Sequence, residues 1–211
     1  MNYKKFNGVH KEILSNQQLE LLPLLKMANR NFGLVGGTAV ALQIGHRRSI
    51  DFDLFSYEEF KNKDIQKKVG RVAKITKVLV NKTGEYTFFS QDVKVTFFNY
   101  PYRIEYEKSF DKIIKMPDLL TLAAMKAFAL GQRAKWKDYV DLYFIIKDFF
   151  SFEKISRKSK EIFGPEFNEK LFRIQLSYFN DVNYEEEVEF LPGFKVSDEK
   201  IKTKLVEFSL N

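Results

Sequence analysis

The sequence of 211 residues predicts an α+β fold, in which a mixed sheet flanked by helices is followed by a C-terminal helical region. Three observations support this prediction. A Gly-Gly pair at residue 36 separates a short apolar segment from a helical one, and residues 50–54 alternate between apolar and acidic side chains. Beyond residue 117 the apolar spacing is mostly helical. We therefore expect a core at residues 1–115, a helical part at 116–211, and a functional cleft between them.

The first predicted element is a helix at residues 15–30. Ser15 and Gln18 have the spacing of a capping box, in which each side chain binds the other's backbone N–H. Pro23 interrupts the segment, but the apolar pattern continues past it. One continuous helix is the expectation.

A short buried strand ending at Leu34 and Val35 is predicted to turn at Gly36 and Gly37, which carry no Cβ to clash. Thr38 is then the expected cap of a helix that runs to residue 42. A helix N-terminus with free N–H groups attracts phosphate. The alternative interpretation is a turn with a structural role only.

Asp51 and Asp53 lie two residues apart in the next predicted strand, so both carboxylates point to one face. Ile50, Phe52 and Leu54 occupy the opposite, buried face. Two neighbouring carboxylates repel each other unless a cation lies between them, and such oxygen ligands suit Mg²⁺ or Mn²⁺. The alternative is a solvated polar face on an edge strand.

The rest of the core is predicted to contain a helix at residues 60–69 and strands within 74–98, turned at 83–85 and near 91–92. In the last strand Val93, Val95 and Phe97 are expected to point inward. Lys94 and Thr96 then belong to the polar face, together with Asp92.

The C-terminal half reads as a series of helices, at residues 117–131, 135–149, 152–163, 166–180 and 198–208. Lys126 is the anomaly, because its helix is apolar around most of its circumference and a buried ammonium needs an anionic partner. Asp138 and Asp141, at i and i+3 of the next helix, are possible partners. An ion pair joining the two helices and a bound phosphate are both compatible with this pattern.

Composition narrows the class of protein. The chain has no cysteine, which excludes disulfides and thiolate zinc sites. No long apolar run appears, and Met1 to Phe6 lack the apolar core of a signal peptide, so we expect a cytoplasmic protein with no membrane association.

The net charge of +7 is compatible with binding to a polyanion such as tRNA. Trp136 is as compatible with packing as with base stacking, and the acidic residues 185–189 read as a solvated loop.

The segment from Gly36 to Leu54 resembles the signature of the DNA polymerase beta-like nucleotidyltransferase superfamily. Its Gly45-His46-Arg47-x-Ser49 portion is similar to one branch, the AbiEii-type nucleotidyltransferase toxins of abortive-infection and toxin–antitoxin systems. A second block agrees: between residues 119 and 142, Lys126 is followed by Arg-x-Lys-x-Lys-Asp-x-x-Asp. The two blocks together span roughly residues 32–146, and their order and separation are more specific than either motif.

This resemblance implies a nucleotidyltransferase-type sheet and transfer of NMP from an NTP to an acceptor, with RNA such as a tRNA end first among acceptors. It also implies a cognate antitoxin. It assigns metal binding to Asp51 and Asp53, and nucleotide binding to six residues: Gly36, Gly37, Thr38, Arg47, Ser49 and Lys126. The expected catalytic residues are Asp51, Asp53, Lys126, Asp138 and Asp141.

Thr96 is a departure, because the wider superfamily has a third carboxylate on a later strand of the sheet. Asp138 or Asp141 could supply that acid, which we favour; the site could instead hold only one metal tightly, or be degenerate. Two other functions remain open from the sequence. They are a nucleotide or RNA sensor without turnover, and kinase-like transfer of phosphate to a protein hydroxyl.

Overall fold

The computed structural model describes residues 8–210, so the segment Met1–Phe6 lies outside the described part. Its centre is a five-stranded sheet of order β1-β2-β5-β4-β3. The β2–β5 pair is parallel and the other pairs are antiparallel, which confirms the predicted mixed sheet. The strands are β1 (Gly33–Val35), β2 (Phe52–Ser56), β3 (Lys77–Lys82), β4 (Glu85–Ser90) and β5 (Val93–Asn99).

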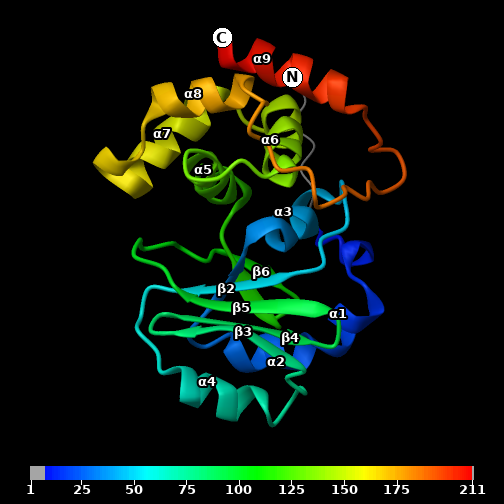
Figure 1. Ribbon diagram of the computed structural model, residues 1–211, viewed down its shortest axis with the longest axis vertical. Coiled ribbons are helices and arrows are strands. Elements are labelled where there is room, and N and C mark those ends of the chain that lie inside the picture. The colour runs from blue at the N-terminus through cyan, green and yellow to red at the C-terminus, as the bar shows by residue number, and fades with distance from the viewer. Residues whose placement is uncertain (1–7, 211) are drawn as a thin grey trace.

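Successive side chains of the strands point to opposite faces of the sheet, so one face belongs to the hydrophobic core and the other to the cleft. Phe52 and Leu54 of β2, and Val95 and Phe97 of β5, are fully buried on one face, as predicted. The prediction that Ile50 shares this buried face is wrong: Ile50 is 53% exposed, because it precedes the strand, which begins at Phe52. Helices α2 (Leu22–Ala28) and α4 (Asn62–Val69) lie on that side (Figure 1). Asp53 and Thr96 are register partners on the opposite face, and both line a cavity together with residues of α5.

The prediction of a single helix at residues 15–30 is wrong. The capping box of Ser15 and Gln18 is present, but the helix it opens, α1 (Asn16–Glu20), is short. The chain then turns at Leu21 and α2 begins, with Pro23 in its first turn. Proline has no backbone N–H to donate, so it is accommodated at a helix start and not in the interior of a helix.

The C-terminal part is helical, as predicted. It contains α5 (Leu119–Leu130), α6 (Trp136–Asp148), α7 (Phe152–Phe163), α8 (Glu169–Ser177) and α9 (Asp198–Leu210). Helix α3 (Gly36–Ile44) lies between the sheet and this group, and packs against α5 and α6 (Figure 1). The sequence did not predict the hairpin of β6 (Lys108–Phe110) and β7 (Ile114–Met116), because three-residue strands show too little alternation.

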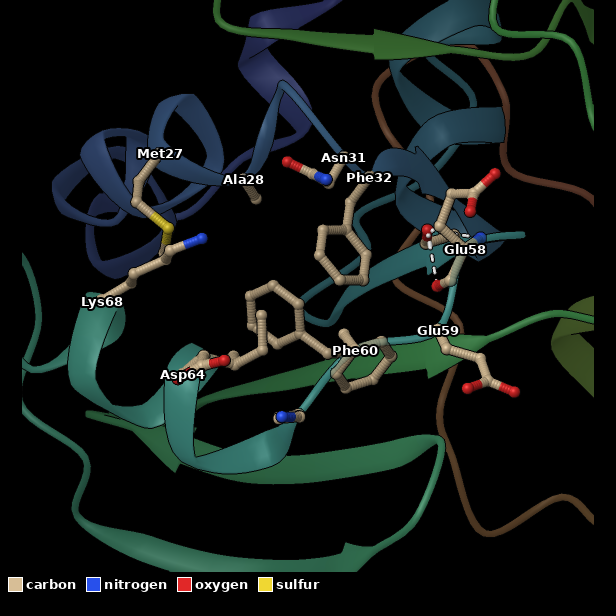
Figure 2. A pocket seen from close by; sticks show the side chains of 13 residues that line it. Met27, Ala28, Asn31, Phe32, Glu58, Glu59, Phe60, Asp64 and Lys68 are labelled. Carbon is tan, nitrogen blue, oxygen red and sulfur yellow. Dashed lines mark hydrogen bonds between the residues drawn. The ribbon is translucent and has the colours of Figure 1, made fainter.

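Two cavities lie on opposite faces of the sheet. The cavity in Figure 2, of about 460 Å³, opens between α2 and α4, and the rings of Phe32, Phe60 and Phe97 contribute to its wall. Phe97 alternates with Thr96 along β5, so this cavity is on the side away from Asp53. Among residues 8–210 no helix has the length and apolar character needed to cross a membrane.

Candidate active site

The Gly-Gly turn places helix α3 against the acidic strand. Gly36 has a φ of +71°, a conformation that side chains rarely adopt. A Cβ at this position would lie 2.1 Å from Oδ2 of Asp53, so only glycine allows the carboxylate to approach the backbone so closely. Gly37 has a similar role, because a Cβ there would lie 2.7 Å from an Arg47 guanidinium nitrogen.

The prediction that Thr38 caps the helix is wrong. Helix α3 begins at Gly36, and Val35 is the N-cap residue without a side-chain hydrogen bond. Thr38 is therefore in the first turn, and its buried hydroxyl donates to the backbone oxygen of Asp51 and lies 3.0 Å from Ser49 Oγ. The Thr38 hydroxyl thus connects the first turn of α3 to the segment that immediately precedes β2.

Asp53 is the second residue of β2 and Asp51 immediately precedes the strand, so the prediction that both acids lie within it holds for Asp53 only; both side chains are partly exposed. Burial raises the pKa of Asp53, and the neighbouring Asp51 carboxylate raises it further. The Lys94 ammonium lies 2.7 Å from Asp51 Oδ2. This pair of repelling carboxylates, already neutralised in part by a cation, has the oxygen donor set that fits Mg²⁺.

Asp141 lies at the centre of a buried ionic cluster. Arg47 binds it with two hydrogen bonds, of 2.7 Å from Nε to Oδ1 and 2.8 Å from a terminal nitrogen to Oδ2. His46 Nε2 and Lys126 Nζ are each 2.7 Å from its oxygens. Burial alone would raise the pKa of Asp141, but Arg47 and Lys126 hold it well below its usual range. An ionised carboxylate only accepts hydrogen bonds, so His46 Nε2 carries the proton.

Lys126 joins this cluster to a second carboxylate. Its Nζ is 2.5 Å from Asp138 Oδ1, and the other Asp138 oxygen is 3.3 Å from Arg133 Nε. Burial opposes the charge on Lys126, but Asp138 and Asp141 raise its pKa overall. The ion pair between the two helices is therefore present, and the Lys126 ammonium stays charged.

A cleft of about 390 Å³ lies between the sheet and α5. Val35, Gly36, Asp53, Lys94, Lys126 and Arg133 surround one part of it. Its lining does not include Asp138 or Asp141, which are 3 % and 0 % exposed and hold Lys126 and Arg47 from behind. Arg47 and Ser49 are also buried, beneath the Gly37 turn. Of the predicted site residues, Gly36, Asp53 and Lys126 thus line the cleft. Arg47, Ser49, Asp138 and Asp141 are buried behind its lining.

Thr96 lies in the cleft beside Asp53, at the position where a third acid was expected. The cleft does contain another carboxylate, on Glu85 of β4, which the sequence analysis missed. The signal that would have found it is the register of the β4–β5 hairpin, which places Glu85 and Thr87 on the face that carries Thr96 and Phe98.

The acidic segment 185–189 is not simply solvated. Glu186 lies 2.8 Å from Lys135 Nζ and 3.4 Å from Lys137 Nζ, and Glu189 lies 2.7 Å from Arg48 Nε. The hydrogen bond from Lys135 lowers the pKa of Glu186 to about 2. Trp136 is buried and stacked on Tyr139, so it packs and is not available for a base.

Gly36→Ala tests the close approach of Asp53 to the turn. We expect a loss of stability of about 1–2 kcal/mol from the positive φ, and in addition a strong loss of nucleotidyl transfer because the new methyl group displaces the carboxylate. Gly193→Ala is the matched control, since Gly193 has a φ of +86° with open space around it. Urea unfolding and a transfer assay measure both effects; equal activity of the two variants would contradict the expectation.

Solved structures share this architecture. MenT4, the nucleotidyltransferase toxin Rv2826c of Mycobacterium tuberculosis, superposes with a TM-score of 0.57 at 12% identity, over 92% of this chain and 83% of its own. JHP933 of Helicobacter pylori superposes with a TM-score of 0.55 at 16% identity, over 93% of this chain and 92% of its own. At this level of identity the likeness concerns the fold, which is of the nucleotidyltransferase type.

Sequence comparison identifies the family. The family model described as "Nucleotidyl transferase AbiEii toxin, Type IV TA system" matches residues 28–189. An uncharacterised protein of Aquifex aeolicus is 30% identical over 203 residues, covering 92% of this chain and 96% of its own. This chain belongs to the AbiEii family of nucleotidyltransferase toxins, and is a nucleotidyltransferase enzyme. Membership of a toxin–antitoxin family implies an NTP substrate and an antitoxin partner.

Proposed function

We propose that this protein transfers a nucleoside monophosphate from an NTP to a hydroxyl of RNA, with the acceptor end of tRNA as the first candidate. The observation that supports the proposal best is the cleft in which Asp53, Lys94, Lys126 and Arg133 face the Gly36 turn. In such a cleft the acidic group can bind a metal ion and the basic groups can bind the phosphates of a metal-bound polyphosphate. The proposed action is that of a toxin, restrained by an antitoxin, in the cytoplasm.

Asp51 and Asp53 would hold the Mg²⁺ or Mn²⁺ ion, which when bound offsets the negative charge on the phosphates and at the transferring phosphorus. The ammonium groups of Lys94 and Lys126 and the guanidinium of Arg133 bind phosphate oxygens from the other walls of the cleft. The first N–H groups of α3, around Gly37 and Thr38, have no partner within the helix and donate to the same anion.

The acceptor hydroxyl attacks the α phosphorus, a new P–O ester bond forms, the bond to the β phosphate breaks, and pyrophosphate leaves. The hydroxyl proton passes to a carboxylate of the site or to water. Asp138 and Asp141 act in this proposal as positioning residues, because they hold Lys126 and Arg47 and do not line the cleft. Buried fixed charges keep the cations aligned without reorganisation during the reaction.

The experiment is transfer of label from each NTP, radiolabelled at the α phosphate, onto total bacterial RNA and protein in the presence of Mg²⁺. Label on RNA supports the proposal, and digestion of the product identifies the acceptor end. Label on protein alone would contradict the RNA acceptor. An added mass equal to phosphate would instead indicate kinase-like transfer. Label on neither, with the NTP still bound, would leave a sensor.

Glu186→Gln tests whether Lys135 and Lys137 contribute to RNA binding. We expect RNA to bind up to about fivefold tighter, because the two ammonium groups are released from an exposed pairing worth less than 1 kcal/mol. Filter binding at several salt concentrations measures the affinity and the number of phosphate contacts. Glu187→Gln is the control, as Glu187 is exposed and its described contacts include no ion pair. Equal affinities for the two variants would exclude the lysines from the RNA surface.

A further inference from the structure

The cleft beside Asp53 has two chemically different parts. Charged side chains surround the part next to Gly36, as described above. The other part is apolar and largely aromatic, with walls from the sheet and from α5, and its lining comprises Phe55, Phe98, Tyr100, Leu122, Met125 and Phe128. A nucleotide has the same division, into a charged phosphate end and a flat, mostly apolar base.

Three aromatic rings form a continuous surface in the apolar part. Phe55 of β2 is the register partner of Phe98 of β5, and their ring centroids are 5.2 Å apart. The Tyr100 ring lies 5.0 Å from that of Phe55. All three residues are only half-buried, so part of each ring faces the open cleft. Partly exposed aromatic rings of this kind provide a stacking surface for a base.

Glu85 lies at the far side of this aromatic surface. Its register partner is Phe98, and two strand spacings, about 10 Å in all, separate β4 from β2. Between Asp53 and Glu85 the floor of the cleft is the small side chain of Thr96, whose hydroxyl is 3.4 Å from that of the buried Thr87 on the neighbouring strand. This floor leaves room for a ribose and a base between the two carboxylates.

The Glu85 carboxylate is held in place at the cleft. The Lys82 ammonium lies 3.0 Å from Oε2, and the Thr87 hydroxyl lies 3.5 Å from Oε1. The Glu85 side chain is 21% exposed, whereas Lys82 is 68% exposed. A carboxylate accepts hydrogen bonds and cannot donate them, so it selects a partner with N–H groups.

We propose that the aromatic part of the cleft binds the nucleobase of the NTP, and that Glu85 favours bases with an exocyclic amino group over uracil. This inference rests on the proposed function of the cleft. Adenine, cytosine and guanine each carry an amino group that donates to a carboxylate. Uracil has a single ring N–H between two carbonyl oxygens, and these oxygens repel the carboxylate. A site built to accept a hydrogen bond from an N–H group of the ligand discriminates against the analogue that lacks that group.

The experiment compares CTP with UTP, whose bases differ by an amino group against a carbonyl at one ring position and by the hydrogen on the adjacent ring nitrogen, which only uracil carries. Calorimetric binding with Mg²⁺, without acceptor, is expected to show the wild-type protein binding CTP at least about tenfold more tightly. Glu85→Gln is expected to reduce that ratio by about tenfold, because the amide can donate to the carbonyl oxygen. Lys82→Met, which retains the carboxylate, is expected to keep the wild-type preference.

Three results would overturn the inference. They are equal affinity of the wild-type protein for CTP and UTP, an equal loss for all four NTPs in Glu85→Gln, and the same change of preference in Lys82→Met. The second would indicate contact with ribose, and the third an effect of the hairpin ion pair alone. Failure of the proposed function is a separate result, because it is measured in the transfer assay as the absence of label on RNA, whatever base preference the binding assay shows.

Discussion

Replacing Asp53 by asparagine is expected to lower nucleotidyl transfer by roughly a thousandfold while the fold keeps its full stability. The loss corresponds to about 4 kcal/mol of transition-state stabilisation, the several kcal/mol that a metal on this carboxylate would supply. Stability is retained because burial and Asp51 already disfavour the charged form of Asp53, as its raised pKa shows. An asparagine of the same shape removes that repulsion.

The measurement pairs a transfer assay with urea unfolding. Asp92→Asn is the matched control, since Asp92 is exposed in the turn before β5 and lies outside the cleft lining. We expect the control to keep wild-type activity and stability. An Asp53→Asn variant that is active would exclude the metal role; one that is inactive and also unfolds easily would show that Asp53 is needed for the structure. Only lost activity with retained stability supports the assignment.

Asp141→Asn is expected to destabilise the fold, unlike Asp53→Asn, with a loss of about 3–5 kcal/mol in the free energy of unfolding. Three donors converge on this carboxylate, from Arg47, His46 and Lys126, and the side chain has no access to solvent. Removing its charge leaves the Arg47 guanidinium buried without its counter-ion. The connection between the 46–48 loop and helix α6 is then weakened, and transfer falls because the fold around Lys126 is lost.

The control for this variant lies on the same helix. Asp148 at the end of α6 is 42% exposed and pairs with Lys147 at 3.1 Å, so Asp148→Asn should change stability by less than about 1 kcal/mol. Denaturant unfolding at neutral pH measures both variants. A loss below 1 kcal/mol in Asp141→Asn would contradict the structural role.

The pH dependence of the Asp141 effect has a definite sign. The pKa of Asp141 is depressed in the folded chain, so its contribution is fully present above the ordinary value of 3.8. It is lost only as the pH falls below that value and through the depressed pKa. The difference in stability between the wild-type protein and Asp141→Asn should therefore stay constant from neutral pH to about pH 5, and decrease only in stronger acid.

Local patterns determined much of this fold. The alternation of Phe52, Asp53 and Leu54 indicates which face of β2 is buried, because successive strand residues point to opposite sides. Gly36 marks a backbone turn with a positive φ, which residues other than glycine rarely adopt. The helices beyond residue 117 follow from apolar periodicity, and the Lys126 anomaly correctly indicated carboxylate partners. These features depend on neighbours in the sequence, so the sequence suffices to predict them.

Tertiary structure alone decided which charged groups meet in the cleft and which support it from behind. Arg47 and Asp141 are 94 residues apart, and their pairing depends on how α3 packs against α6. Glu85 lies at the cleft because of the register in which β4 pairs with β5. Glu186 contacts Lys135 because the segment that follows α8 passes next to the loop between α5 and α6. Periodicity shows that a side chain is buried or exposed, but not what it meets, because that contact depends on the relative placement of distant elements.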